Sequence, residues 1–212
     1  MAYNGENRKI KANQTKQKIF ESAAKLFSSN DYNEVSIDSI VQMAGVAKGS
    51  FYVHFTSKDA LVRALINDQV EKADNDYKSL LASLPDDVPA ETVLFSMIEK
   101  ITDVLIEKIG CDKMRAVYKA QITKDIDTGV VTSYNREIYS IFSDVLERGI
   151  RRGEFITDMP LEILTKHLMM AIRGITYEWC VRYPEFDYKA QLLQHFKLIM
   201  AGLRKPSLVE TK

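Results

Sequence analysis

Apolar side chains recur every three to four residues over most of the chain, which is the period of a helix with one buried face. Strict apolar–polar alternation, the pattern of a half-buried strand, is scarce. The expected fold class is therefore all-α. The pattern predicts helices over residues 14–28, 36–44, 48–54, 57–84, 90–109, 112–124, 129–152, 160–181 and 188–204.

The residues between these segments support the predicted helix ends. Ser36 and Ser57 are suitable N-caps, and Asp187 precedes a long apolar-rich run. Gly45 tolerates positive φ and suits an abrupt turn between two short helices. A polar connection is expected over residues 31–34, and the first twelve residues are predicted to be a loose basic tail.

Composition fits a globular protein, because 46% of the 212 residues are hydrophobic and 27% are charged. The length allows one large domain or a small and a larger one. The formal net charge is zero, with 29 basic and 29 acidic residues, and by itself gives no reason to expect nucleic acid. The charge is nevertheless uneven. Residues 1–30 hold six basic and two acidic side chains, whereas residues 61–108 hold five basic and ten acidic ones.

Several classes of protein and site are disfavoured. Cys111 and Cys180 lack disulfide-framework or zinc-finger spacing, and the three histidines show no i, i+4 pairing, so we expect no metal and no cofactor. No catalytic triad, Walker loop or dinucleotide fingerprint is found, which argues against an enzyme. No secretory signal or membrane-spanning run is recognised, so a cytoplasmic location is expected.

Residues 36–55, SIDSIVQMAGVAKGSFYVHF, carry the most informative pattern. Two short helices joined at Gly45 match a helix-turn-helix, whose second helix enters the major groove of DNA. Lys48 and Ser50 are candidates for base edges, and Tyr52 and Lys58 for phosphates. The complete set of expected DNA-binding residues is Ser36, Lys48, Gly49, Ser50, Tyr52, His54 and Lys58.

Over residues 14–65 the chain resembles the TetR family of transcriptional regulators, whose signature runs close to T-x-x-x-I-A-x-x-A-G-V-S-x-G-x-L-Y-x-H-F-x-S-K-x-x-L. The matching positions are Ser36, Ile40, Val41, Ala44, Gly45, Val46, Ala47, Gly49, Phe51, Tyr52, His54, Phe55, Ser57, Lys58 and Leu61. Departures from the usual residue include Val41 for Ala, Phe51 for Leu and Ala47 for Ser. Ala47 removes a capping hydroxyl, a loss of about 1 kcal/mol.

The resemblance implies a three-helix DNA-binding head over residues 1–57, joined by a long helix to an effector-binding and dimerisation domain over residues 58–212. It implies a homodimer through the last two helices, a double-stranded DNA operator and an unidentified small-molecule effector. The implied function is a ligand-responsive repressor released from a palindromic operator. The alternatives are a helical small-molecule sensor without specific operator binding and, less well supported, a helical enzyme.

The resemblance also suggests which side chains line an effector cavity: Tyr118, Tyr134, Phe142, His167, Met170, Arg173 and Tyr177. His167 and Arg173 are polar groups on otherwise apolar helix faces, suited to a ligand carbonyl or carboxylate. They are equally suited to solvent or to a dimer partner. Aromatic and methionine side chains at helical spacing are also the ordinary content of a core, so this pattern alone leaves both interpretations open.

Overall fold

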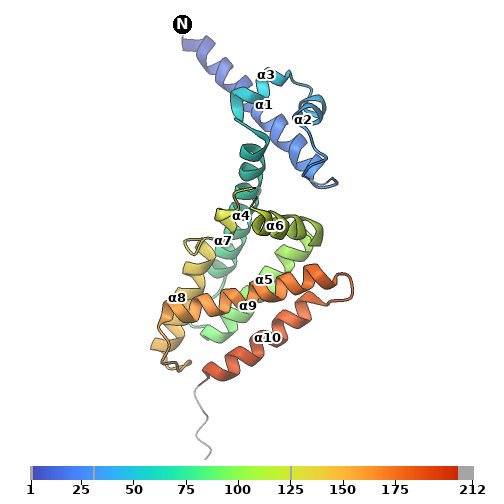
Figure 1. The fold of residues 1–212 in the computed structure, drawn as a ribbon. Helices are drawn as coiled ribbons and strands as arrows, with labels where there is room; N and C mark the ends of the chain where they lie inside the picture. The colour runs from blue at the N-terminus through green and yellow to red at the C-terminus, as the bar shows by residue number, and fades with distance from the viewer. Residues whose placement is uncertain (1, 31, 125, 205–212) are drawn as a thin grey trace, which may run out of the picture. The chain divides into compact units, whose positions relative to one another are not determined.

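The computed structural model describes residues 2–30, 32–124 and 126–204, with side chains from residue 7 onward. Within these residues the chain is helical, with one isolated backbone bridge between Phe155 and Arg204 (Figure 1). The helices are α1 (Ala2–Phe27), α2 (Ile37–Ala44), α3 (Lys48–His54), α4 (Lys58–Ser83), α5 (Ala90–Asp103), η1 (Val104–Ile109), α6 (Cys111–Thr123), α7 (Gly129–Thr132), α8 (Glu137–Arg151), α9 (Leu161–Arg182) and α10 (Tyr188–Leu203). The all-α prediction is confirmed.

The helices group into two compact units. The first comprises residues 1–69 and 116–131, and the second comprises residues 70–115 and 132–212. Helix α4 contributes its first half to the first unit and its second half to the second. The division between the two units falls within α4, after residue 69, and the predicted domain boundary after residue 57 stays a prediction.

The head, formed by α1, α2, α3 and the start of α4, has its own apolar core. Its buried side chains are Ile19, Ala23, Val35, Ile40, Val41, Phe51, Phe55 and Leu61. Phe51 is fully buried and packs against Phe55 with ring centroids 5.8 Å apart. The larger ring at this position therefore fills the centre of the head.

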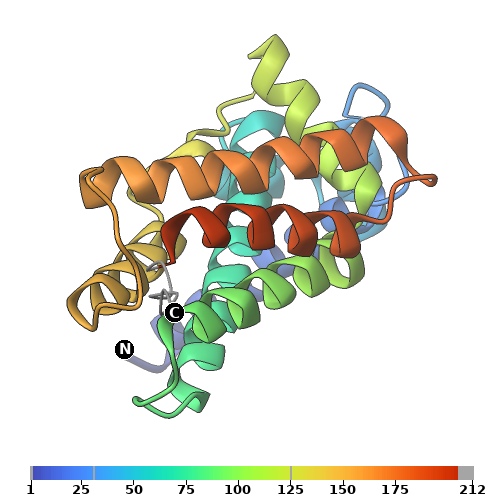
Figure 2. The same ribbon diagram turned by 90° about the horizontal axis from the view of Figure 1, so that it is seen from below.

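The second unit is built around four long helices. Helices α9 and α10 run side by side, α5 packs on α10, and α8 packs on α9 and α5 (Figure 2). Its largest fully buried side chains include Leu94, Met97, Phe142, Leu168 and Phe196. The Asp187 side chain accepts a hydrogen bond from the Ala190 N–H at 3.0 Å, which confirms the predicted N-cap of α10.

Two stretches differ from the predicted pattern. Residues 2–12 belong to α1 instead of forming a loose tail, because the segment lacks proline and its Lys, Arg and Glu side chains favour helix. The predicted helix over residues 129–152 is divided into α7 and α8. At the break, the Ser133 hydroxyl accepts a hydrogen bond from the Asn135 N–H at 3.0 Å, a local turn that competes with helix. Asp31 of the predicted polar connection lies outside the described residues.

Candidate functional site

Helices α2 and α3 form a helix-turn-helix whose ends are set by local hydrogen bonds. The Ser36 hydroxyl accepts from the Ser39 N–H, and the Ser39 hydroxyl accepts from the Ser36 N–H, each at 3.0 Å. This reciprocal pair satisfies two amide donors that the helix leaves free. Gly45 ends α2 with φ +65°, a conformation that favours glycine and turns the chain abruptly towards α3.

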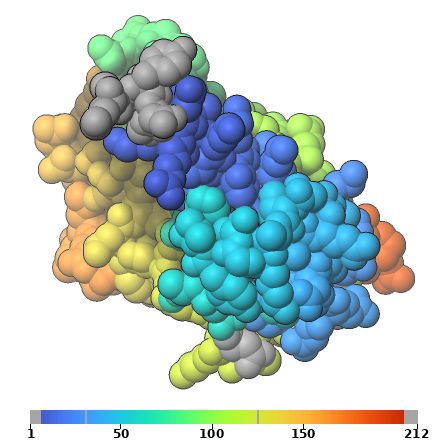
Figure 3. Space-filling model, turned by 90° about the horizontal axis from the view of Figure 1, so that it is seen from above, coloured from blue at the N-terminus to red at the C-terminus, as the bar shows by residue number. Residues whose placement is uncertain are grey.

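Helix α3 divides sharply into a buried and an exposed face. Phe51 points into the core, whereas Lys48, Gly49 and Tyr52 are exposed and Ser50 and His54 are half-buried. Figure 3 shows the outer face of the head, where the side chains of α2 and α3 lie beside those of α1. The structure thus gathers the predicted α3 residues on one short, accessible helix.

One exposed side chain of α3 was not selected from the sequence. Val53 is an apolar residue with 77% of its surface exposed. Val53 lies two positions from each of the buried residues Phe51 and Phe55, so the helical period places it on the opposite, outward face. An exposed methyl pair on this face is suited to contact a thymine methyl group.

Helix α3 begins without a side-chain cap. Ala47 occupies the N-cap position, with φ −69° and ψ 148°, and offers no hydrogen-bonding side chain. This confirms the loss predicted from the sequence. The Lys48 ammonium at the first turn instead pairs with Asp38 of α2, with Nζ 2.8 Å from Oδ1. The hydrogen bond and the charge of Asp38 raise the pKa of Lys48, so this lysine carries its own counter-ion.

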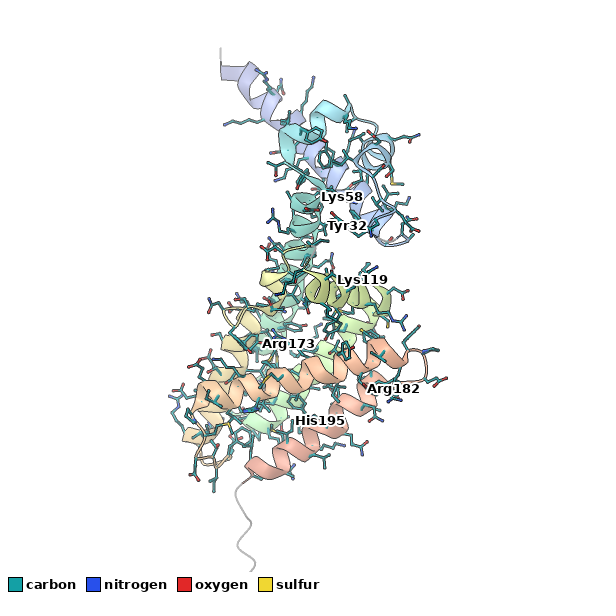
Figure 4. All side chains as sticks on the ribbon, in the orientation of Figure 1. Tyr32, Lys58, Lys119, Arg173, Arg182 and His195 are labelled. Atoms are coloured by element: carbon teal, nitrogen blue, oxygen red, sulfur yellow. The ribbon has the colours of Figure 1, made fainter. Side chains whose placement is uncertain are left out.

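Lys58 ties the start of α4 to the connection between α1 and α2. Its Nζ donates to the Tyr32 carbonyl at 2.8 Å and to the Val35 carbonyl at 3.0 Å. The ammonium also lies 3.8 Å from the centroid of the Tyr32 ring, whose hydroxyl donates to Asp59 (Figure 4). Burial lowers the pKa of Lys58. The residue predicted to contact phosphate is therefore already engaged within the head.

The predicted effector-binding residues do not form one group. Phe142 is fully buried core, and Tyr118 lies in the unit that contains the head. The exposed side chains of His167, Met170 and Tyr177 lie along α9 at a spacing of three or seven residues, so they share its outer face.

A polar cluster in the second unit includes two of the predicted residues. The Arg173 guanidinium lies 5.8 Å from the Tyr134 ring centroid and 5.6 Å from that of Tyr139. Beside it, Arg136 Nη2 lies 2.6 Å from Asp74 Oδ1, and both side chains are largely buried. No sequence signal indicated this cluster, because Asp74 and Arg136 are separated by 62 positions.

The two cysteines are close in space although distant in sequence. Cys111 and Cys180 are buried free thiols, and a hydrogen bond between them contributes to both pKa values. Burial is the largest cause of both shifts and raises the pKa of Cys180 to about 12. Such thiols are poor nucleophiles.

Neither a metal centre nor a membrane span is found in the part of the chain that the structure describes. No group of three or more His, Cys, Asp or Glu side chains there is placed to hold a metal ion. No helix there is long and apolar enough to cross a membrane.

Comparisons with known proteins agree with the helix-turn-helix. Residues 19–65 match the model of the bacterial regulatory proteins of the tetR family. The regulator UidR of Escherichia coli K12 is 28% identical over 202 residues, which cover 93% of this chain and 97% of UidR. The repressor BepR of Brucella suis is 23% identical over 207 residues, covering 94% of this chain and 96% of BepR.

Solved structures share the fold over nearly the whole chain. A Mesorhizobium loti protein superposes with a TM-score of 0.72 at 17% identity, covering 92% of this chain and 98% of the other. FadR of Bacillus subtilis, in complex with stearoyl-CoA, superposes with a TM-score of 0.67 at 18% identity, covering 88% and 98%. With its helix-turn-helix head and its helical second unit, the chain is similar to the TetR family of bacterial transcriptional regulators in sequence over residues 19–65 and in fold over nearly its whole length.

Proposed function

We propose that the protein is a homodimeric repressor that binds a palindromic operator through α3 and releases it when a small molecule binds the second unit. The exposed face of α3 is the observation that carries this proposal. It offers Lys48, Ser50 and Tyr52 as hydrogen-bonding groups beside Val53, a mixture of polar and apolar contacts suited to base edges and phosphates. Such a regulator acts in the cytoplasm, where the operator lies.

Each predicted contact residue has a specific role in this proposal. Lys48 exchanges Asp38 for a base edge or phosphate, and Tyr52 reaches a phosphate with its hydroxyl. Gly49, which has open space around its α-carbon, allows the helix to approach the groove closely. Ser36 and His54 lie at the start of α2 and the end of α3 and support these contacts. The Lys58 ammonium has three N–H donors, of which two bind carbonyl groups. The third can donate a hydrogen bond to a phosphate.

The outer face of α9 supplies the dimer contact in this proposal. The exposed stripe comprises Ile163, His167, Met170, Gly174, Tyr177 and Val181. Gly174 at its centre has no atom within 4 Å of the position where a Cβ would lie, so a helix from a second copy can approach closely. Leu198 on α10, 70% exposed, extends the apolar surface onto the last helix. Burying this stripe removes apolar surface from water.

Effector action requires a difference in binding between two states. A ligand lowers operator affinity only if it binds more tightly to a conformer whose heads do not match successive major grooves, about 34–36 Å apart. A coupling of about 1–3 kcal/mol weakens operator binding roughly 5–150-fold. The names of similar proteins, among them a repressor and a regulator in complex with stearoyl-CoA, support a small-molecule effector for this chain.

The decisive experiment is selection of bound DNA from a random double-stranded library, followed by titration of the enriched sequence at several salt concentrations. We expect an inverted repeat with half-sites about one helical turn apart. Lys48→Ala should lose about 1–3 kcal/mol at one base position or flatten the salt dependence by about one phosphate contact. Lys113→Ala, at an exposed lysine of α6 in the second unit, is the matched control and should do neither.

Failure to enrich any sequence would contradict the proposal. Together with tight binding of a small molecule, that result would favour the alternative of a helical sensor without operator specificity, for which the uncapped start of α3 at Ala47 is the structural argument. Turnover of a bound compound would favour an enzyme instead.

A further inference from the structure

The second unit contains buried polar atoms that have no partner. They are Nε of Arg136, Nε of Arg148 and the hydroxyl of Tyr139, which make no hydrogen bond to any described residue. Tyr139 is only 5% exposed, so water does not readily supply the missing bond. Burying a donor without a partner opposes folding, and such groups in a native protein usually have a use. We name Asp74, Tyr134, Arg136, Tyr139 and Arg173 the arginine–tyrosine cluster.

Two of these donors, on Arg136 and Tyr139, belong to neighbouring side chains. Arg136 is the N-cap of α8 and Tyr139 follows three positions later, a spacing that places side chains on one side of a helix. The charge of Arg136 lowers the pKa of Tyr139, against the larger effect of burial, so the guanidinium lies near the phenol. The second unit thus holds an unpartnered N–H and an unpartnered O–H on neighbouring side chains.

A second positive charge lies beside Tyr139. Arg173, from α9, lies 5.6 Å from the centroid of the Tyr139 ring, and its charge also lowers the pKa of that tyrosine (Figure 4). Its Nη2 is held by the Thr132 carbonyl at 3.1 Å, which fixes the guanidinium in place. Tyr134, 48% exposed, packs edge-on against Tyr139 with centroids 5.1 Å apart and forms the outer wall of the cluster.

We propose that the arginine–tyrosine cluster binds a carboxylate group of the effector, with Arg136 Nε and the Tyr139 hydroxyl as donors and Arg173 as the neighbouring cation. The inference rests on the proposed function, because the carboxylate belongs to the molecule that regulates DNA binding. Two donors match the two oxygens of a carboxylate, whereas a phosphate has three terminal oxygens to satisfy.

The same contacts give the carboxylate a route to α4. Arg136 Nη2 is bound to Asp74 of α4 at 2.6 Å. A second carboxylate on this guanidinium competes with Asp74 for its charge. Occupancy of the cluster therefore weakens the link between α8 and α4, the helix that begins in the head at Lys58.

Thermal unfolding of the full chain in simple carboxylates tests the proposal. The probes are sodium formate, acetate and benzoate, compared with chloride and with phosphate at equal ionic strength and pH. We expect the carboxylates to raise the unfolding midpoint over chloride by about 2–4 °C at a concentration several times their dissociation constant. Phosphate should raise it less.

The variant Tyr139→Phe separates a binding role from a structural one. It should lose the carboxylate shift, whereas its midpoint in chloride should stay equal or rise, because a buried hydroxyl without a partner is removed. The control is Tyr188→Phe, which removes a buried hydroxyl that is bonded to Thr176 at 2.8 Å. Tyr188→Phe should lower the midpoint in chloride and keep the carboxylate shift.

Three results would overturn the proposal: no carboxylate shift in the wild-type protein, an equal shift in Tyr139→Phe, or a shift produced by phosphate alone. Operator binding by the wild-type protein in chloride is measured in parallel. If DNA binds and the carboxylate shift is missing, the cluster assignment fails while the regulator stands. If the carboxylate shift is present and no DNA binds, the proposed regulator function fails while the carboxylate site in the cluster stands.

Discussion

Replacing Lys58 by methionine removes the ammonium that ties α4 to the α1–α2 connection and keeps most of the apolar stem. Two carbonyl groups, those of Tyr32 and Val35, lose a charged donor at 2.8 and 3.0 Å. The Tyr32 ring loses a cation 3.8 Å from its centroid. All three contacts hold together segments that are 23 or more positions apart in sequence, so no local structure replaces them.

The expected cost is about 2 kcal/mol of the free energy of unfolding. Each net hydrogen bond contributes about 1 kcal/mol, and a partly exposed cation–π contact about 0.5–1 kcal/mol. Desolvation of the ammonium opposes these gains, since burial lowers the pKa of Lys58. For a chain of this length, 2 kcal/mol corresponds to a midpoint about 4–8 °C lower.

The assay is thermal and urea unfolding of wild-type protein, Lys58→Met and the control Lys18→Met, which alters an exposed lysine of α1. A double-mutant cycle with Tyr32→Ala isolates the coupling between the tyrosine ring and the ammonium. The alkaline limb adds a second measurement. Because the folded-state pKa of Lys58 lies below the ordinary 10.5, wild-type stability should rise with pH as the pH passes through that lowered value. Lys58→Met should lack this rise.

An unchanged unfolding midpoint in Lys58→Met would refute the claim that the contacts of Lys58 with Tyr32 and Val35 stabilise the head. The salt dependence of operator binding then identifies a phosphate contact independently: a slope of log affinity against log salt that falls by about 0.9 per lost contact assigns the remaining N–H of Lys58 to DNA. A lower midpoint with an unchanged slope assigns the residue to the internal structure of the head alone.

Four further results are expected. Gly174→Arg should keep the fold and yield monomers by light scattering, whereas Gly174→Ala should remain dimeric; dimers of both would contradict the α9 interface. Gly149→Ala should lower stability by about 1–3 kcal/mol in urea unfolding, because its Cβ would lie 2.4 Å from aromatic ring carbons. Asp38→Asn should raise affinity for random DNA and steepen its salt dependence by freeing Lys48, and an unchanged titration would count against this. Cys180 should react with a thiol reagent at pH 8 only after unfolding, since burial raises its pKa to about 12.

Most of the fold could be predicted because helical periodicity and caps are local. Ser36, Gly45 and Asp187 mark helix ends through contacts within three or four residues, and each has the predicted role. The break at residues 133–136 was missed because apolar residues continue at helical spacing through it. Only the hydroxyl of Ser133 reveals the turn.

The candidate sites were harder to predict because they depend on contacts distant in sequence. The contacts between Tyr32 and Lys58 and between Asp74 and Arg136 join residues that are far apart along the chain. No hydrophobic periodicity in the sequence indicates that these residues are in contact. Met170 shows the complementary difficulty. Its helical spacing suits core, cavity and interface equally, and only its 45% exposure places it on an outer face.

The pair formed by Lys48 and Asp38 bears on how quickly such a protein finds its site. On random sequence, a phosphate must displace a carboxylate 2.8 Å away before it gains the lysine, so each wrong encounter is brief. In the proposed function, the other contacts of α3 form together at a matching sequence and offset the loss of the Asp38 contact. A lysine that brings its own carboxylate to the groove thus shortens dwell time on the many competing sites of a genome, which leaves more molecules free to search.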